Sequence, residues 1–357
     1  MSRTSEEEFI IGRDSRILIT GATGFIGSRL AARLLERGFR NLRCLGRPSG
    51  KMGQLEALCQ KYGDRAQVEF FRGNLLSRED CAAATRDAEV IFHLAAGTGD
   101  KSFPGAFMNS VVTTRNLIEA SHTHGCLRRF VSTSSFTVYT NNGAPRKKTL
   151  DESAPVEQHP EKRCDAYSFA KIRQDELVTE YGRRLGIPYV IVRPGYVYGP
   201  GKRAITGRVG VDTFGIFLHL GGSNTIPFTH VDNCAEAVAL AGLTRGVDRE
   251  VFNVVDDDLP SSREFLRKYK RQVRNFKSVY IPHALSFALC CLWEKYSEWS
   301  EGQLPPAFNR ADWYVSWKKT RYTNEKIKRL LGWKPVIATG DGLQQYFEAC
   351  RESFQHA

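Results

Sequence analysis

Long apolar runs are missing from the sequence. The longest one, residues 281–293, has about a dozen residues and contains a proline and a histidine, whereas a membrane-spanning helix needs about twenty apolar residues. The N-terminus also lacks the basic and apolar stretches of a signal peptide, because Glu6, Glu7 and Glu8 precede Phe9. We therefore expect no membrane span and a cytoplasmic location.

Paired cysteines are absent as well. The nine cysteines are scattered, and no two of them form a CxxC motif. An odd, scattered set favours reduced thiols over a disulfide framework or a zinc site. His122 and His124 do not change this, because side chains two residues apart on a helix point away from each other. We predict no metal site.

Acidic residues are fewer than basic ones. The sequence has 39 Asp and Glu but 51 Lys and Arg, which gives a formal net charge of +12. Such an excess suits nucleic acid, an anionic membrane surface or a polyphosphate ligand. The sequence has no interleaved aromatic and basic motif, so nucleic acid is not expected as a partner. With 357 residues, 41% of them hydrophobic, the chain is long enough for one large domain, or for a core domain and a smaller one.

Short β-branched runs alternate with longer amphipathic stretches along most of the chain. This alternation predicts an α/β fold, a Rossmann-type doubly wound parallel sheet with helices on both faces. Strands are expected at 16–20, 42–45, 68–71, 90–94, 129–134, 189–192 and 251–254, and helices near 27–38, 53–62, 78–86, 106–124, 166–185 and 231–245.

The first expected strand runs directly into Gly21, Gly24 and Gly27, and a helical pattern follows. Glycines allow a tight turn and a close approach of the backbone to a pyrophosphate, which the helix N-terminus then faces. The strand before and the helix after favour dinucleotide binding over an ordinary turn. We predict a polar tail at 1–15, a dinucleotide-binding domain from 16–194 and 229–257, and a smaller substrate-binding domain from 195–228 and 258–357.

The end of the second strand indicates which dinucleotide is bound. An acidic residue at this point is typical of NAD binding, whereas an arginine accommodates the 2′-phosphate of NADP. Here no acid is present, Arg47 lies at the end of the strand, and Lys51 follows. We expect NADP to be preferred over NAD, and the alternative is that Arg47 is a solvated surface residue.

Tyr167 and Lys171 lie one turn apart at the start of an expected helix. Only this pair follows a strand that ends in serines. The same spacing recurs at Tyr198/Lys202, Tyr314/Lys318 and Tyr322/Lys326. A phenol titrates near 10, so it acts as a base near neutrality only if a nearby charge stabilises the tyrosinate, and we expect Lys171 to do so. The alternative is an ordinary surface pair.

Taken together, these motifs resemble those of the extended short-chain dehydrogenase/reductases, also called the NAD-dependent epimerase/dehydratase family. The resemblance runs from about residue 16 to residue 254. It rests on the glycine loop and on segments 87–96, 132–139, 167–171, 193–194 and 230–233. It implies a homodimer built from the helices near 106–124 and 166–185.

The resemblance also implies roles for individual residues. Ser135, Tyr167, Lys171 and Asn109 match the catalytic positions, with Ser135 orienting the substrate oxygen and Lys171 also holding the nicotinamide ribose. Asn74 matches a position beside the adenine, where the family usually has Asp. The cofactor-binding residues implied in this way are Gly21, Thr23, Gly24, Phe25, Ile26, Gly27, Arg47, Lys51, Asn74, Leu75, Leu94, Ala95, Ala96, Lys171 and Pro194.

Two positions bear on the substrate. Nucleotide-sugar enzymes of the family usually carry Asn two residues after the position of Pro194 and an Arg shortly before the position of His230, but this chain has Tyr196 at the first place and no Arg in 224–229. These features resemble the 3β-hydroxysteroid and sterol dehydrogenase branch, and they imply that Tyr196 and Ser135 contact the substrate. That branch usually uses NAD, whereas Arg47 favours NADP, so this chain departs from the branch at that position.

We therefore expect an NAD(P)-dependent oxidoreductase that interconverts a secondary alcohol and a ketone, with a steroid- or lipid-like substrate as one option. The alternatives are a nucleotide-sugar epimerase or dehydratase that recycles its cofactor, and a non-catalytic dinucleotide sensor.

Residues 263–277 combine apolar positions at helical spacing with a basic face, and the apolar run 281–293 follows. Two interpretations are open. The segment is either a helix with a solvated face and a core helix behind it, or a surface that rests on an anionic membrane. We expect the former.

Overall fold

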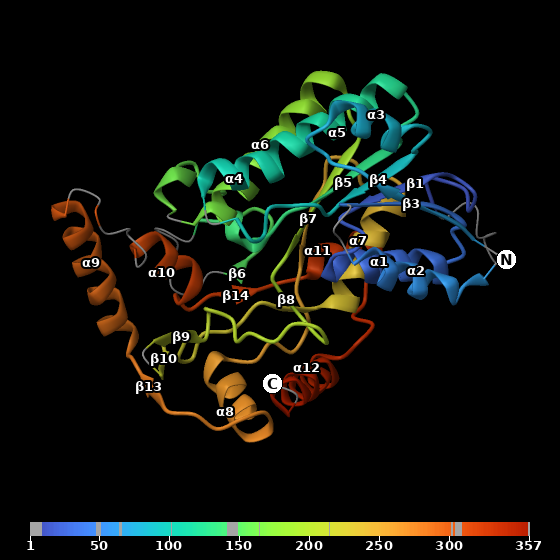
Figure 1. Ribbon diagram of the computed structural model, residues 1–357. Coiled ribbons are helices and arrows are strands. Elements are labelled where there is room, and N and C mark those ends of the chain that lie inside the picture. The colour runs from blue at the N-terminus through green and yellow to red at the C-terminus, as the bar shows by residue number, and fades with distance from the viewer. Residues whose placement is uncertain are drawn as a thin grey trace.

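The computed structural model describes residues 9–47, 51–63, 66–100, 102–140, 149–163, 165–213, 215–300, 303 and 309–355. Its centre is a seven-stranded sheet in which every neighbouring pair of strands is parallel (Figure 1). The sheet therefore confirms the predicted α/β class.

The strands lie in the order β12-β7-β5-β4-β1-β2-β3. Their bounds are β1 (Ile17–Thr20), β2 (Asn41–Gly46), β3 (Gln67–Arg72), β4 (Val90–His93), β5 (Arg129–Thr133), β7 (Tyr189–Pro194) and β12 (Val251–Val254). Each expected strand agrees with one of these to within two residues at either end. Because β1 pairs with β4 on one side and with β2 on the other, the strand order reverses direction at β1.

Helices cover both faces of this sheet (Figure 1). One face carries α1 (Phe25–Glu36), α2 (Met52–Gln60) and α7 (Val231–Leu243), and the other carries α3 (Arg78–Thr85), α5 (Thr113–His124) and α6 (Ala166–Leu185). Two separate apolar clusters result, one on each face, as the doubly wound architecture requires.

The single helix expected at 106–124 is instead three segments. They are α4 (Phe103–Phe107), the π-helix η2 (Met108–Val112) and α5. Helical periodicity in a sequence does not distinguish a π-helical turn from an α-helical one. Such turns are frequent at functional sites, and this one carries Asn109.

The other elements lie outside the main sheet. Smaller sheets pair β8 (Tyr196–Tyr198) with β11 (Phe228–His230), β9 (Gly210–Thr213) with β10 (Ile216–His219) and β13 (Ser278–Tyr280), and β6 (Thr149–Leu150) with β14 (Arg321–Tyr322). The remaining helices are α8 (Ser262–Gln272), α9 (His283–Trp299), α10 (Arg310–Ser316), α11 (Glu325–Leu331) and α12 (Thr339–Gln355), with short 3-10 turns η3 (Phe136–Val138) and η4 (Pro160–Lys162).

A third apolar cluster, rich in aromatic rings, joins several of these elements. The Phe265 ring of α8 packs, tilted, against Phe228 of β11 and against Tyr346 and Phe347 of α12, with ring centroids 5.1 to 6.2 Å apart. Asn233 of α7 joins the C-terminal segment to this helix, since its side chain bonds the backbone at 336 and 337. The exact boundaries of the two domains stay a prediction.

Candidate active site

The turn between β1 and α1 is too tightly packed for side chains. Gly21 has a φ of +69°, and a Cβ there would lie 2.8 Å from the backbone nitrogen of Ala95. A Cβ on Gly27 would lie 2.2 Å from the carbonyl oxygen of Gly21. The first turn of α1 has no acidic residue, and Gly24 supplies no side-chain cap. The backbone N–H groups at this helix N-terminus therefore suit an anion such as a pyrophosphate.

The loop after β4 lies against this turn. The backbone nitrogen of Leu94 donates to the Thr20 carbonyl oxygen at 3.2 Å, and that of Ala95 donates to Thr20 Oγ1 at 3.4 Å. Leu94, Ala95 and Ala96 are half-buried there. The two loops meet where the strand order reverses, which is the place where doubly wound sheets bind dinucleotides. The residues at this place fit a dinucleotide cofactor.

The remaining residues of the turn are also half-buried, namely Thr23, Phe25 and Ile26. The Phe25 ring is covered from the loop after β8, where Lys202 Nζ lies 5.8 Å from its centroid.

The end of β2 adjoins the turn. A Cβ on Gly46 would lie 3.1 Å from Thr23 Cγ2. Arg47 follows directly and is exposed, and within the described part of the chain its side chain has no hydrogen bond or ion pair. Lys51, at the N-terminus of α2, is exposed too. The structure thus leaves Arg47 free to reach a ligand beside the glycine turn.

Asn74 and Leu75 follow β3. Asn74 is exposed, and its backbone nitrogen donates to Asp80 Oδ2 at 2.7 Å, while Leu75 is buried and accepts a hydrogen bond from Asn116 at its carbonyl. Pro194 is buried at the end of β7. Their contacts with a cofactor stay predictions.

Ser135 and Tyr167 come together from two different elements. Ser135 lies two residues after the end of β5 and caps the short turn η3, where its Oγ accepts from the Thr137 nitrogen at 3.3 Å. Tyr167 lies in the first turn of α6, which Asp165 caps by accepting from the backbone nitrogens of Tyr167 and Ser168. The Ser135 hydroxyl lies near enough to the Tyr167 phenol to lower its pKa. The pair that the sequence separates by 32 positions is thus a single polar unit at the carboxyl edge of the sheet.

Lys171 is buried one turn further along α6. Its Nζ donates to the Thr133 carbonyl oxygen at 2.6 Å and to Gln174 Oε1 at 2.9 Å. Burial lowers the pKa of Lys171 to about 8, and the nearby charge of Asp175 opposes that shift.

The pKa of Tyr167 differs from the expectation. Burial raises it to about 12, the carboxylates of Asp165 and Asp175 add to the rise, and the nearby Ser135 hydroxyl opposes it. The physical reason is that Lys171 gives its hydrogen bonds to Thr133 and Gln174, while the phenol loses solvation. In this state Tyr167 holds its proton at neutral pH.

Asn109 lies in the π-helical turn near the loop after β4. Its Nδ2 donates to Asp100 Oδ2 at 2.9 Å, and a Cβ on Gly97 would lie 3.1 Å from Asn109 Cβ. Among the described residues its amide therefore bonds Asp100 rather than Tyr167 or Lys171, and its catalytic role stays a prediction.

Sequence reasoning missed a buried polar chain that links the glycine turn to Lys171. His93 Nδ1 bonds Thr20 Oγ1 and His93 Nε2 bonds Thr114 Oγ1, each at 2.8 Å. Gln174 Nε2 donates to the same Thr114 oxygen at 2.8 Å, and its Oε1 accepts from Lys171. One local signal was available, because Gln174 lies three residues after Lys171 and so shares its helix face.

The burial of His93 within this series of hydrogen bonds predicts how the stability of the protein depends on pH. Burial lowers the pKa of His93 to about 3, so the folded state holds a neutral imidazole where the unfolded chain binds a proton below about pH 6.5. The free energy of unfolding should therefore fall as pH drops from about 6.5 toward 3, by up to about 1.4 kcal/mol per unit from this group. Urea unfolding from pH 7 to pH 5 should show a flatter pH dependence for His93→Gln than for the unsubstituted protein, and parallel curves would contradict the prediction.

Tyr196 lies in β8, beyond the end of β7. Its hydroxyl donates to the Ala204 carbonyl oxygen at 3.2 Å, and its ring packs edge-on against Phe228. Burial raises the pKa of Tyr196. Contact between Tyr196 and a substrate stays a prediction.

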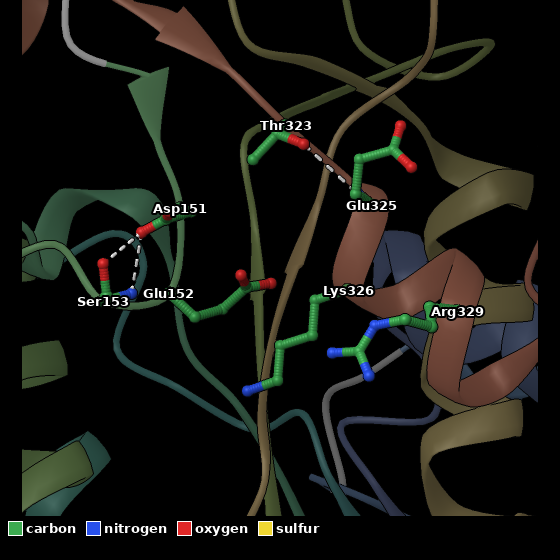
Figure 2. Close-up of a pocket in the computed structure, with 7 residues that line it drawn as sticks. All are labelled: Asp151, Glu152, Ser153, Thr323, Glu325, Lys326 and Arg329. Atoms are coloured by element: carbon green, nitrogen blue, oxygen red, sulfur yellow. Dashed lines mark hydrogen bonds between the residues drawn. The ribbon is translucent and has the colours of Figure 1, made fainter.

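A cleft of about 600 Å³ lies elsewhere, between β6 and α11. Figure 2 shows Glu152, Lys326 and Arg329 facing the same space. The lining residues are Asp151, Glu152, Ser153, Thr323, Glu325, Lys326 and Arg329. No residue that the sequence predicts for catalysis or cofactor binding lines it, and its mixed charges select no ligand.

Metal-binding clusters and membrane-spanning helices are both absent from the described residues. These residues contain no group of three or more His, Cys, Asp or Glu side chains that could hold a metal ion. Nor do they contain a helix long and apolar enough to cross a membrane.

Known proteins share this architecture. GDP-mannose 3,5-epimerase 1 of Oryza sativa subsp. indica is 28% identical over 276 residues, which cover 72% of this chain and 68% of the rice protein. Cinnamoyl-CoA reductase 2 of Medicago truncatula is 28% identical over 238 residues, covering 64% of this chain and 68% of that one. The crystal structure of UDP-glucuronic acid 4-epimerase from Bacillus cereus in complex with NAD superposes with a TM-score of 0.68 at 22% identity, covering 95% of this chain and 99% of the epimerase.

The narrower resemblance to the steroid dehydrogenase branch finds no support in these similarities, which include nucleotide-sugar epimerases. The broader resemblance, to the whole family, is supported. The model of the NAD dependent epimerase/dehydratase family matches residues 17–254, from the start of β1 to the end of β12. The chain therefore belongs to the NAD dependent epimerase/dehydratase family of enzymes.

Proposed function

We propose that the protein transfers a hydride between a nicotinamide cofactor and a substrate carbon that carries a hydroxyl or carbonyl oxygen. The observation that carries this proposal is that Ser135 and Tyr167 lie together at the carboxyl edge of the sheet, with Lys171 buried one turn away. The bound nicotinamide would supply or accept the hydride. Ser135 would orient the substrate oxygen, and Tyr167 would exchange a proton with it.

The protonation state of Tyr167 is the one that ketone reduction needs. A phenol whose pKa is raised to about 12 holds its proton at neutral pH, so it is ready to donate that proton to a carbonyl oxygen that receives a hydride. We therefore propose an oxidoreductase that interconverts a ketone and a secondary alcohol, and that can be assayed as a ketone reductase.

A second candidate is a nucleotide-sugar epimerase or dehydratase, in which the cofactor is reoxidised within each turnover. The identity to the rice GDP-mannose epimerase supports it. Tyr196 argues against this candidate, because it occupies the position where an asparagine is usual and its hydroxyl donates to the Ala204 carbonyl oxygen.

Cofactor consumption separates the two candidates. The reductase oxidises NADPH in proportion to a ketone substrate, which absorbance at 340 nm follows. The epimerase converts GDP-mannose or a UDP- or dTDP-sugar, detected by chromatography, with no net change in cofactor. Tight cofactor binding without turnover in either assay would instead indicate a dinucleotide sensor.

We also propose that NADP is preferred over NAD, because Arg47 is exposed beside the glycine turn and its side chain has no partner among the described residues. A charge-assisted bond to the 2′-phosphate contributes about 1.5–3 kcal/mol, so Arg47→Ala should weaken NADPH binding about ten- to a hundredfold and leave NADH binding unchanged. Titration by protein fluorescence measures both dissociation constants, with Lys61→Ala, an exposed cation at the far end of α2, as the matched control. Equal affinities of the unsubstituted protein for NADH and NADPH would contradict the preference.

We propose a homodimer formed through α5 and α6. Phe107 and Met108, at the adjoining turn, are exposed, and Phe107 lies 6.5 Å from the Phe169 ring of α6. Light scattering should give twice the mass of a single chain. Met108→Glu should lower the measured mass to that of one chain. The cytoplasmic location stays a prediction.

A further inference from the structure

One side of α9 is apolar and faces away from the molecule. Leu285, Leu289, Leu292, Tyr296 and Trp299 recur at helical spacing and are between 49% and 77% exposed. Spacings of four and three residues place them in one stripe along the helix. The apolar run at 281–293 is therefore not the core helix that the sequence led us to expect.

The other side of α9 holds the helix to the protein. Ser286 and Cys290 are buried, and Trp313 of α10 donates from Nε1 to Ser286 Oγ at 2.9 Å. The Phe287 ring packs against Trp313 with centroids 5.0 Å apart. In Figure 1, α9 stands at the edge of the molecule with α10 on its inner side. The outward stripe has no such neighbour within the described part of the chain.

The exposed apolar surface continues into β13. Val279 and Tyr280 are exposed, and the chain passes from them through Pro282 directly into α9. Helix α8 borders this strand, because the Arg263 guanidinium lies 5.4 Å from the Tyr280 ring centroid and Lys270 Nζ donates to Ser278 Oγ at 3.0 Å.

The border is strongly basic. Between 262 and 280 the one acidic residue is Glu264, and it is held in the capping box of α8 by Ser261. The apolar side of α8 is buried, so its cations line the outer side. Seven basic residues lie in this segment, namely Arg263, Arg267, Lys268, Lys270, Arg271, Arg274 and Lys277, and all but the half-buried Lys270 are exposed.

We propose that these residues form a docking face for an anionic lipid bilayer. The docking face consists of the α9 stripe, Val279 and Tyr280, and the basic residues of 263–277. The leucines would enter the boundary between headgroups and acyl chains, Tyr296 and Trp299 would lie at the headgroup level, and the cations would face anionic headgroups. The 17-residue α9, about 25 Å long, would lie flat on the surface.

Charge selects the lipid over a second copy of the chain. In a symmetric dimer the same patch meets itself, which would bring the basic borders of both copies together. An anionic bilayer offers apolar depth and opposite charge at once.

Vesicle flotation with the full-length protein tests the proposal. The protein should float with phosphatidylcholine vesicles that contain about one third phosphatidylglycerol, and not with pure phosphatidylcholine vesicles. Raising NaCl from about 0.1 M to about 0.5 M should release most of it, because screening weakens the cations. No flotation with anionic vesicles, or equal flotation with neutral ones, would overturn the proposal.

Two variants test the two parts of the face separately. Leu289→Glu/Leu292→Glu should reduce the bound fraction at least tenfold, while Val336→Glu, an exposed valine outside the face, should not. Lys268→Glu/Arg271→Glu should also reduce the bound fraction at least tenfold. Arg86→Glu/Arg183→Glu, which changes the net charge equally, is its control. Circular dichroism confirms that each variant is folded. If the leucine variant binds vesicles normally but turns a lipid-free dimer into a monomer, the face is an interface between copies and the lipid proposal is wrong.

Discussion

Tyr167→Phe is expected to lower kcat by about two to four orders of magnitude, because it removes the group that exchanges a proton with the substrate oxygen. The substitution removes one oxygen and keeps the ring, so the packing at the start of α6 is preserved. The interaction with Ser135 is lost, but the cofactor turn lies on other elements. The dissociation constant for NADPH should therefore change less than threefold.

The sequence provides a matched control in Tyr314, which has the same spacing to Lys318. In the structure Lys318 Nζ lies 5.1 Å from the Tyr314 ring centroid, so this pair is a packing contact on and just after α10. Tyr314→Phe should retain the full kcat. The assignment of Tyr167 fails if Tyr167→Phe keeps more than a tenth of the turnover, or if both tyrosine variants lose it equally.

The local pattern of the sequence was sufficient for the main sheet. It also singled out Tyr167 among the tyrosine pairs, and that choice stays a prediction. The strands could be located because each is a short β-branched run bounded by turns. Tyr167 could be separated from Tyr314 because only Tyr167 follows a strand that enters the parallel sheet, whose carboxyl edge gathers the functional loops.

What the sequence could not give depends on contacts between distant residues. The direction of the Tyr167 pKa shift follows from its burial and from which acceptors Lys171 finds, and both are tertiary properties. The His93 chain joins β1, β4, α5 and α6 without any motif. The sequence pattern of the apolar run in α9 is the same whether its outer side is covered or exposed. Only the structure therefore shows that the residues of the docking face are exposed.

Asp175→Asn is expected to lower the free energy of unfolding by about 3–5 kcal/mol, because it leaves the Arg193 charge buried without its partner. Both side chains are buried, and Asp175 Oδ2 lies 3.0 Å from Arg193 Nη2 and 3.1 Å from Nε. The Arg193 guanidinium also stacks 4.8 Å from the Tyr139 ring centroid, which keeps it in place after the substitution. Urea unfolding measures the loss. Asp14→Asn, which removes an exposed partner of Arg40, should leave the midpoint nearly unchanged.

The same variant should shift the alkaline limb of kcat/KM toward lower pH. Burial holds the pKa of Lys171 at about 8, and the negative charge of Asp175 raises it against that effect. Removing the charge therefore lowers the pKa further, by about one unit. If Lys171 must be an ammonium for turnover, kcat/KM should decline above about pH 8 in the unsubstituted enzyme and about one pH unit earlier in Asp175→Asn. Superimposable alkaline limbs, measured at a temperature where both proteins are fully folded, would show that the charge of Lys171 does not control turnover.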